Sequence, residues 1–158
     1  MLADGRESVE RVSQSSMALE FPSNEWVAAY RDAINANPDY AKFGKDWTHG
    51  VVAMVVKAEP SLGIVEDLAM WLDVHEGKCR ECRLMPAKEA EEKAPFVVVA
   101  SYAQWKQVIK TEIDPTSALM QGKLKLTKGH MPTMVKHVNA SKQLVESTTR
   151  VATKFKDD

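Results

Sequence analysis

Apolar positions recur at helical spacing early in the chain, between Ser23 and Pro38. The four residues that share this spacing are Trp26, Val27, Tyr30 and Ile34. Intervals of three and four residues place such side chains on one face of a helix. Ser23 or Asn24 can cap its start, and Asn37-Pro38 should end it. The pattern predicts an amphipathic helix, followed by a short helical turn over residues 39–47.

Four later segments have the composition or alternation of β-strands. They are residues 50–57, 65–75, 79–84 and 96–100. If Lys57 faces solvent, strand alternation turns Val52, Met54 and Val56 inward and leaves the face of Val51, Ala53 and Val55 outward. The same alternation gathers Leu68, Met70, Leu72 and Val74 on one face of the second segment. Residues 76–78 supply a turn, so the second and third segments form a hairpin.

The second half of the chain has the pattern of helices with one more strand. Ser101 can cap a helix that carries Tyr102, Trp105, Val108 and Ile109, and Asp114-Pro115 can start a shorter one. Residues 122–129 alternate strictly, which turns Leu124 and Leu126 to the core. Residues 131–153 are predicted to be one helix, and the charged residues 86–94 a surface loop.

These elements predict an α+β domain with helices on one face of its sheet and the other face partly open. The length of 158 residues fits one domain. Residues 1–22 lack a clear apolar face and are expected to form a tail or a loosely docked helix. We therefore divide the chain into an N-terminal extension, residues 1–20, and one domain, residues 21–153.

Charge and composition narrow the function classes. Twenty-one basic and 22 acidic residues give a formal net charge of −1, so no global field favours a nucleic-acid backbone. No apolar run approaches the roughly 20 residues of a membrane-spanning helix. Neither a secretory signal nor a peroxisomal C-terminal tripeptide is present, and we expect a cytoplasmic protein.

Candidate chemistry in the sequence is weak. Cys79-x-x-Cys82 with His75 offers metal-type ligands, but residues three apart on a regular strand point to opposite faces. We expect no metal site and no cofactor. No motif nominates a nucleophile with its base. The eight methionines and four tryptophans fit either a cavity for a hydrophobic ligand or an adaptable core.

The segment Asp114–Gly129, with an acid-Pro pair, a short apolar helix, Gly-Lys-Leu-Lys and a Gly turn, strongly resembles the signature of the sterol carrier protein family. Ser101–Trp105 resembles the strand-to-helix junction of that family of intracellular lipid carriers, and Trp71–Lys78 is similar to its central hairpin. The resemblance covers about residues 21–140. The segment around Gly122 is its specific part.

The resemblance implies a five-stranded, mostly antiparallel sheet with helices over one face and an apolar tunnel between them. It implies non-enzymatic binding and transfer of a fatty acid, fatty acyl-CoA or sterol-like lipid. Gly122 would allow close backbone approach, and residues 131–138 would form a lid. The expected ligand-contacting residues are Val52, Met54, Val56, Met70, Leu72, Phe96, Val98, Trp105, Leu119, Met120, Leu124, Leu126, Met131, Met134, Val135 and Val138.

Two other functions stay open at this stage. The domain can be an accessory or dimerisation module whose tunnel is small or filled by Trp26, Trp47 and Trp105. A small hydrolase is the less favoured, enzymatic interpretation. The oligomeric state is open, with a dimer as one option, and transient membrane contact is compatible with lipid transfer.

Overall fold

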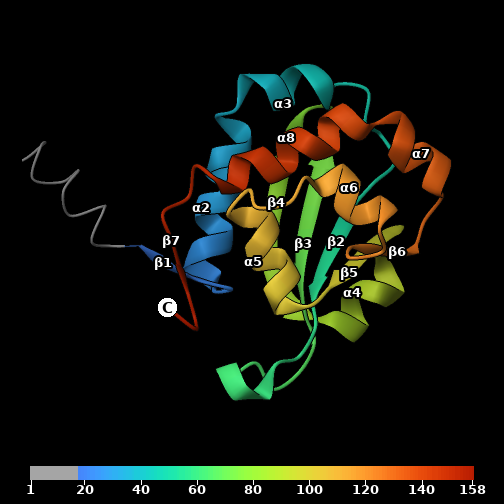
Figure 1. The fold of residues 1–158 in the computed structure, drawn as a ribbon. Coiled ribbons are helices and arrows are strands. Elements are labelled where there is room, and N and C mark those ends of the chain that lie inside the picture. Colours follow the sequence, from blue (N-terminus) through green and yellow to red (C-terminus); the bar gives the residue numbers. More distant parts are fainter. Residues whose placement is uncertain (1–17) are drawn as a thin grey trace, which may run out of the picture.

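A five-stranded sheet forms the centre of the molecule in this computed structural model, which describes residues 18–158. The strand order is β4-β3-β2-β5-β6 (Figure 1). Only β2 and β5 run parallel, and the other neighbours are antiparallel. The strands are β2 (Val52–Val56), β3 (Leu68–His75), β4 (Lys78–Pro86), β5 (Phe96–Ala100) and β6 (Lys125–Lys128). This arrangement confirms the α+β class and the mostly antiparallel sheet.

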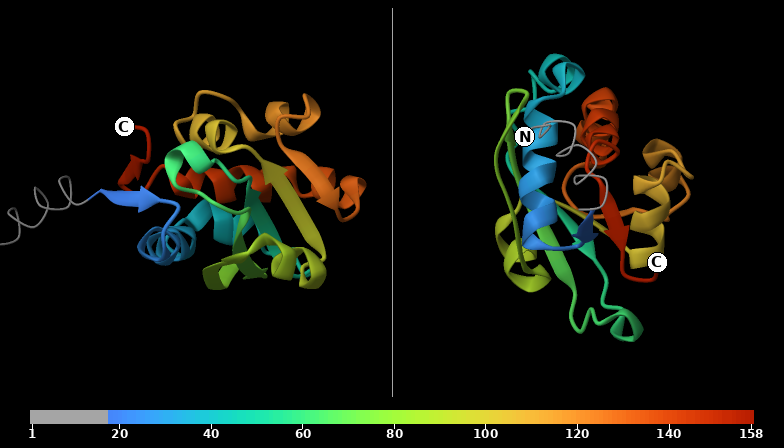
Figure 2. Two further views of the ribbon diagram at one scale, coloured as in Figure 1. Left: turned by 90° about the horizontal axis from the view of Figure 1, so that it is seen from below. Right: turned by 90° about the vertical axis from the view of Figure 1, so that its left-hand side faces the viewer.

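Most of the helices lie on one face of the sheet (Figure 2). In chain order they are α2 (Asn24–Asn35), α3 (Pro38–Phe43), α5 (Tyr102–Ile109), α6 (Pro115–Met120), α7 (Met131–Lys136) and α8 (Val138–Thr148). A short 3-10 turn, Pro60–Leu62, lies in the loop between β2 and β3. None of the helices in residues 18–158 has the length and apolarity that a membrane span requires.

Side-chain caps satisfy the first N–H groups of α2, α3, α5 and α6. Ser23, not Asn24, caps α2, because its Oγ accepts from the backbone N of Trp26 at 3.0 Å. Ser101 and Gln104 form a reciprocal capping box at the start of α5. These local signals explain why the predicted starts agree with the structure.

Asn37 caps α3 and also fixes α8. Its Oδ1 accepts from the backbone N of Asp39 and of Tyr40, at 2.9 and 3.3 Å. Its Nδ2 donates to Ser147 Oγ and to Gln143 Oε1, both at 3.1 Å. The side chain is 1% exposed, so one buried amide joins two helices that lie far apart in the sequence.

The inward faces of the strands agree with the alternation. Val52, Met54 and Val56 belong to the main core, as does the face of β3 that carries Leu68, Met70, Leu72 and Val74. The expectation that Ala53 and Val55 face outward with Lys57 was wrong. Ala53 and Val55 are fully buried in a second, smaller core.

Helix α4 (Ala87–Lys93) covers that second core, where the sequence predicted a surface loop over residues 86–94. Its charged residues face solvent, while Ala87 and Ala90 pack on the sheet. A stripe of alanines is too weakly hydrophobic to stand out among charged neighbours, yet it lets a helix approach the sheet closely.

The predicted single helix over residues 131–153 was also wrong. The chain breaks at His137, between α7 and α8, and ends in strand β7 (Thr153–Phe155). At the break, the His137 ring packs edge-on against Trp47, with centroids 5.1 Å apart. A tertiary contact has thus overridden the helical pattern.

Strand β7 pairs in parallel with β1 (Leu19–Phe21) in a separate two-stranded sheet. The predicted tail over residues 1–22 is therefore a strand at residues 19–21, and residues 1–17 lie outside the described part of the chain. Strand β1 crosses the expected boundary at residue 20, and β7 extends beyond residue 153.

Cys79 and Cys82 share one face of β4, contrary to the expectation from a regular strand. A register shift opposite Asp73 and Val74 accounts for this, and both thiols are buried in the main core. Burial raises the pKa of the Cys79 thiol to about 12 and raises that of Cys82 further. Residues 18–158 contain no cluster of three or more metal-type side chains.

We expect Ala90→Asp to lower the free energy of unfolding by at least about 2 kcal/mol, because the carboxylate would be buried without a partner. Lys88→Asp places the same group on the exposed face of α4 and should change stability by no more than about 0.5 kcal/mol. Urea unfolding of both variants measures this. Equal free energies of unfolding for the two variants would mean that α4 does not cover the sheet.

Candidate ligand-binding cavity

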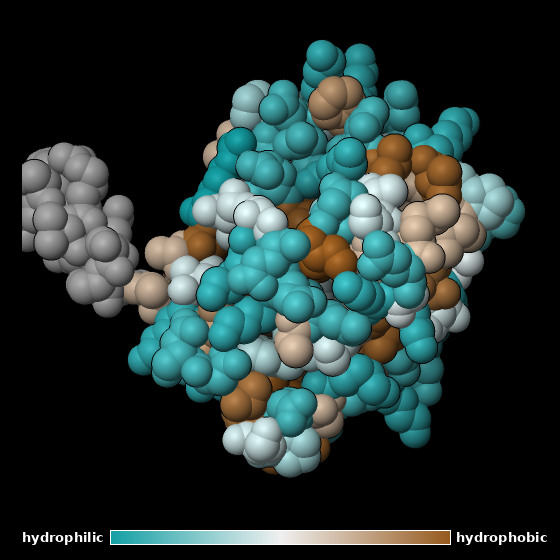
Figure 3. Space-filling view, viewed as in Figure 1, coloured by the Kyte–Doolittle hydropathy of each residue, from teal (hydrophilic) through white to brown (hydrophobic). Residues whose placement is uncertain are grey.

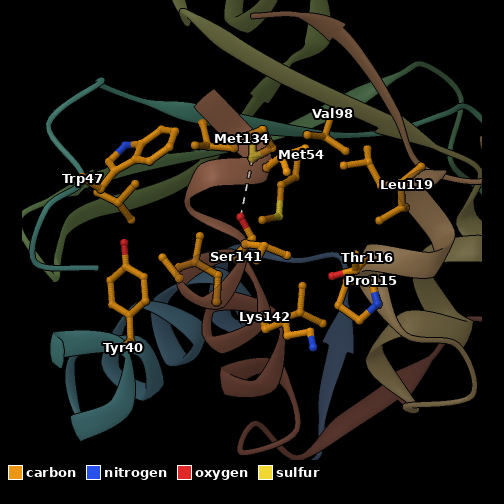
Figure 4. Close-up of a pocket in the computed structure, with 18 of the residues that line it drawn as sticks. Tyr40, Trp47, Met54, Val98, Pro115, Thr116, Leu119, Met134, Ser141 and Lys142 are labelled. Atoms are coloured by element: carbon orange, nitrogen blue, oxygen red, sulfur yellow. Dashed lines mark hydrogen bonds between the residues drawn. The ribbon is translucent and has the colours of Figure 1, made fainter. Parts of the chain in front are cut away.

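A cavity of about 320 Å³ lies between the sheet and the helices (Figure 4). Strands β2, β3 and β5 provide its floor, and α6, α7 and α8 its roof. Helix α3, the following loop and α5 contribute at the sides. The lining residues are Tyr40, Trp47, Val52, Met54, Val74, Val98, Trp105, Pro115, Thr116, Leu119, Met120, Leu124, Met134, Val135, Val138, Ala140, Ser141, Lys142, Leu144 and Val145.

The floor follows from the parallel pairing of β2 and β5. Met54 pairs directly with Val98, so their side chains lie next to each other on the same face of the sheet. Val52 lies two residues before Met54 and points the same way. The cavity floor is therefore a direct product of the alternating pattern.

The roof at α6 depends on a short, tightly capped helix. Asp114 Oδ2 accepts from the backbone N of Ser117 at 3.0 Å, and Pro115 occupies the first turn. After α6, Gly122 adopts φ +77°, and the chain turns back to bring Leu124 beneath the helix. A Cβ on Gly122 would meet nothing within 4 Å. The glycine is needed for its backbone conformation, and the expected close backbone approach is absent.

Both indole groups and one hydroxyl of the lining side chains have hydrogen-bond partners within the protein. The indole N–H of Trp47 donates to the Gly50 carbonyl, and that of Trp105 to the Val55 carbonyl, both at 2.8 Å. Ser141 Oγ donates to Met134 Sδ at 3.5 Å (Figure 4). Of residues 18–158, Lys142 is the one charged residue that lines the cavity.

The mouth of the cavity lies among α6, α7 and α8. Met120 is 77% exposed and Val135 is 52% exposed although both also line the cavity. Hydrophobic surface is visible over these helices on the right of the space-filling view (Figure 3). Pro115, Lys142 and Val145 are shared with an adjoining, more polar hollow that also contacts Asp114 and Glu146. The apolar interior thus reaches the surface beside charged groups.

Residues 31–140 match the SCP-2 sterol transfer family. The chain belongs to this family. A crystal structure of sterol carrier protein 2 is 32% identical, with a TM-score of 0.76 over 82% of this chain and 98% of that one. Among curated proteins, no match to the sequence is found.

Two further structures resemble this member of the SCP-2 family. A conserved hypothetical protein from Thermus thermophilus, described as a candidate sterol carrier protein, is 32% identical with a TM-score of 0.74, over 84% of this chain and 90% of that one. The sterol carrier protein domain 2 of Helicoverpa armigera is 16% identical with a TM-score of 0.52, over 77% and 87%. The latter supports the fold alone.

The cavity of this SCP-2 family chain brings together ten of the expected ligand-contacting residues. They are Val52, Met54, Val98, Trp105, Leu119, Met120, Leu124, Met134, Val135 and Val138. Six others do not line it. Val56, Met70 and Leu72 are buried elsewhere in the main core, Phe96 packs on Trp47, Leu126 is half-buried, and Met131 is 41% exposed.

Ten lining residues were not expected from the sequence. They are Tyr40, Trp47, Val74, Pro115, Thr116, Ala140, Ser141, Lys142, Leu144 and Val145. On α8, Val138, Ser141, Lys142 and Val145 follow the i, i+3, i+4, i+7 spacing of one helix face. A helix started at Val138 would have revealed that face. Tyr40 and Trp47 belong to no such pattern.

Two histidines flank Trp47 beside the cavity. The rings of His49 and His137 lie 5.3 Å apart, and each packs edge-on against the indole. Burial, followed by the nearby His49 and Lys136, lowers the pKa of His137, while Asp46 acts in the opposite direction. The neutral imidazole is therefore the form that this packing favours.

We expect Met134→Trp to leave stability within about 1 kcal/mol of the parent and to weaken fatty-acid binding, because the larger side chain can enter empty volume. Met85 is similarly buried, at 6% against 8%, but it faces α4. Met85→Trp should therefore overpack a filled core and cost about 1 to 3 kcal/mol. Thermal melts and titrations with a fluorescent fatty acid measure both effects. Equal destabilisation would argue that the space under α7 is filled.

We expect stability to fall as the pH drops below about 6.5, because the unfolded chain then binds a proton on His137 more readily than the folded chain does. Above that pH the residue is neutral in both states, so its contribution is fully present. His137→Phe keeps a ring against Trp47 and should flatten this dependence between about pH 7 and 5.5. If urea unfolding shows the same dependence of the free energy of unfolding on pH in the parent and in His137→Phe, then His137 is not the group responsible.

Proposed function

We propose that the protein binds one long-chain lipid in the cavity under α6, α7 and α8 and transfers it without chemistry. The observation that carries the proposal is a cavity of about 320 Å³ whose walls are almost entirely apolar. This volume lies at the lower end of the roughly 300 to 1,000 Å³ typical of small-molecule sites. A single flexible acyl chain suits it better than a bulky polar ligand.

Family membership supports the same function. The matching family is one of sterol transfer, and the 32% identical crystal structure is that of a sterol carrier protein. Carriers need a site that shields an apolar molecule from water, and the residues of this cavity offer such shielding. We extend the carrier function to this chain, with a fatty acid or fatty acyl-CoA as the preferred ligand class.

The hydrophobic effect provides enough free energy for useful binding. Burial of about 14 methylene groups at roughly 0.8 kcal/mol each yields about 11 kcal/mol before costs. Immobilisation of the chain and ordering of the mouth reduce this considerably. Micromolar or tighter binding is consistent with what remains.

Lys142 and Thr116 are the groups we assign to an acidic lipid head. Both line the cavity, and Lys142 is exposed at the mouth between α6 and α8 (Figure 4). A carboxylate buried deeper would be unpaired and would cost several kcal/mol. The head group would therefore remain at the surface while the chain enters the cavity.

The exposed apolar side chains at the mouth fit transient contact with a membrane. Met120, Val135 and Met131 are 77%, 52% and 41% exposed. Exposed lysines, including Lys123 and Lys136, lie in the same segments. Apolar tips among lysines suit the surface of an anionic bilayer.

The alternatives receive less support from the geometry. An accessory module would have its cavity filled by tryptophans, but Trp26 lies outside the lining and bonds to Thr153. For hydrolysis, the lining hydroxyl of Ser141 would need an adjacent base, whereas it donates to Met134 sulfur. Lipid carriage accounts for the open volume, and the other two functions do not.

Binding of palmitic acid and of hexadecanol to delipidated protein tests the proposal. We expect a 1:1 complex with each in native mass spectrometry. Lys142→Ala should weaken palmitate binding about two- to fivefold, as for a solvent-exposed ion pair, and leave hexadecanol unchanged. Lys136→Ala, an exposed lysine outside the cavity, is the matched control.

A second experiment measures the transfer of lipid between vesicles. The protein should accelerate movement of a fluorescent fatty acid from donor to acceptor vesicles, and faster with anionic than with zwitterionic lipid. If neither ligand binds and no lipid is extracted from the purified protein, the carrier function is wrong and the accessory module becomes the better account.

A further inference from the structure

One buried hydroxyl group has no hydrogen-bond partner in the described part of the chain. Among the three tyrosines, Tyr30 donates to the Leu144 carbonyl at 2.8 Å. Tyr102 donates to the Phe21 carbonyl at 3.0 Å and accepts from the backbone N of Lys156 at 2.8 Å. Tyr40 is only 1% exposed, but no such bond joins its hydroxyl to any of residues 18–158. Tyr40 is therefore the one tyrosine whose hydroxyl has no hydrogen-bond partner within residues 18–158.

The Tyr40 hydroxyl points from α3 toward the interior of the cavity (Figure 4). Asn37 caps this helix, and the backbone N of Gly44 donates to the Tyr40 carbonyl at 2.7 Å. The ring rests against Gly44, where an added Cβ would lie 2.8 Å from Tyr40 Cζ. Packing therefore fixes the direction of the hydroxyl before any ligand arrives.

An unpartnered buried hydroxyl carries a cost of about 1 to 3 kcal/mol and needs an explanation. Burial, followed by the neighbouring Cys79, raises the pKa of Tyr40 well above its usual range. The phenol therefore keeps its proton and is available as a donor. A donor aimed into an apolar cavity is suited to an acceptor that arrives with the ligand.

Building on the proposed lipid-binding function, we propose that Tyr40 donates a hydrogen bond to a neutral oxygen carried on the ligand's chain, and that an oxygenated fatty acid is a preferred ligand class. Among residues 18–158, Lys142 is the one charged residue in the lining, and its amino group points away from Tyr40, on the side of Pro115 (Figure 4). An ionised head group beside Tyr40 would lack a cation, whereas a hydroxyl or keto oxygen needs only a donor. The ionised head stays near Lys142, and the chain presents its second oxygen farther in.

The test compares stearic acid with a positional series of monohydroxystearic acids, each titrated into delipidated protein below its self-association concentration. We expect at least one isomer to bind at least about fivefold more tightly than stearic acid, as one satisfied buried hydrogen bond allows. In Tyr40→Phe the affinity for the hydroxylated isomers should fall to that for stearic acid, so that the preference disappears.

Stability of the ligand-free variants separates this role from a structural one. Tyr40→Phe removes a hydroxyl without a partner and should leave the melting temperature unchanged or raised. Tyr102→Phe removes two hydrogen bonds to residues outside the cavity lining, so it should lower the melting temperature but keep the preference for the hydroxylated isomer.

Three results would overturn the assignment. Equal affinity for all the acids in the parent protein would mean that the hydroxyl is satisfied without the ligand, for example by a retained water molecule. Persistence of the preference in Tyr40→Phe would assign it to another group. If no acid binds at all, the lipid-binding function fails together with the role of Tyr40.

Discussion

The buried amide of Asn37 is the interaction on which the rest of the cavity depends. One side chain caps α3, which carries Tyr40, and holds α8 through Gln143 and Ser147. Burying an amide is favourable only when its hydrogen-bonding groups are satisfied, and here both ends of the amide are used. The wall that presents Tyr40 and the roof above it are thus fixed relative to each other.

This anchoring explains how the domain can keep an open volume. Hydrophobic cores normally close to crystal-like density, because empty space loses contacts. Here α8 is held at its C-terminal half by Asn37 and by the bond from Tyr30 to Leu144. Between Val138 and Val145 the same helix also lines the cavity. The lipid chain that we propose as ligand would fill space that the protein's own side chains leave open.

The sequence predicted the part of the site that follows from periodicity. Strand alternation turned Val52 and Met54 inward, and the family resemblance added Val98 and Leu119 as expected ligand contacts; all four line the cavity. The resemblance to sterol carrier proteins supplied the reason to look for a cavity between those elements. These signals are local, so a single sequence carries them.

The missed features depend on contacts between distant segments. Helix α4 faces the sheet with alanines, whose hydrophobic signal is weak, and His137 interrupts a helical pattern to pack on Trp47. Tyr40 lines the cavity because Asn37 and Gly44 position it, and no periodicity marks any of the three. Periodicity also placed Val56 and Met70 in the site, because it shows which face is inward but not which part of that face stays unfilled.

Isotope-filtered nuclear Overhauser spectroscopy tests the central claim most directly. The protein would carry ¹³C-labelled methionine methyl groups and bind unlabelled stearic acid. We predict contacts from the chain methylenes to the methyl groups of Met54 and Met134, and none to Met85 beneath α4 or to Met70 in the filled core. Contacts to Met85, or a bound acid that touches neither Met54 nor Met134, would contradict a lipid site between the sheet and its helical roof.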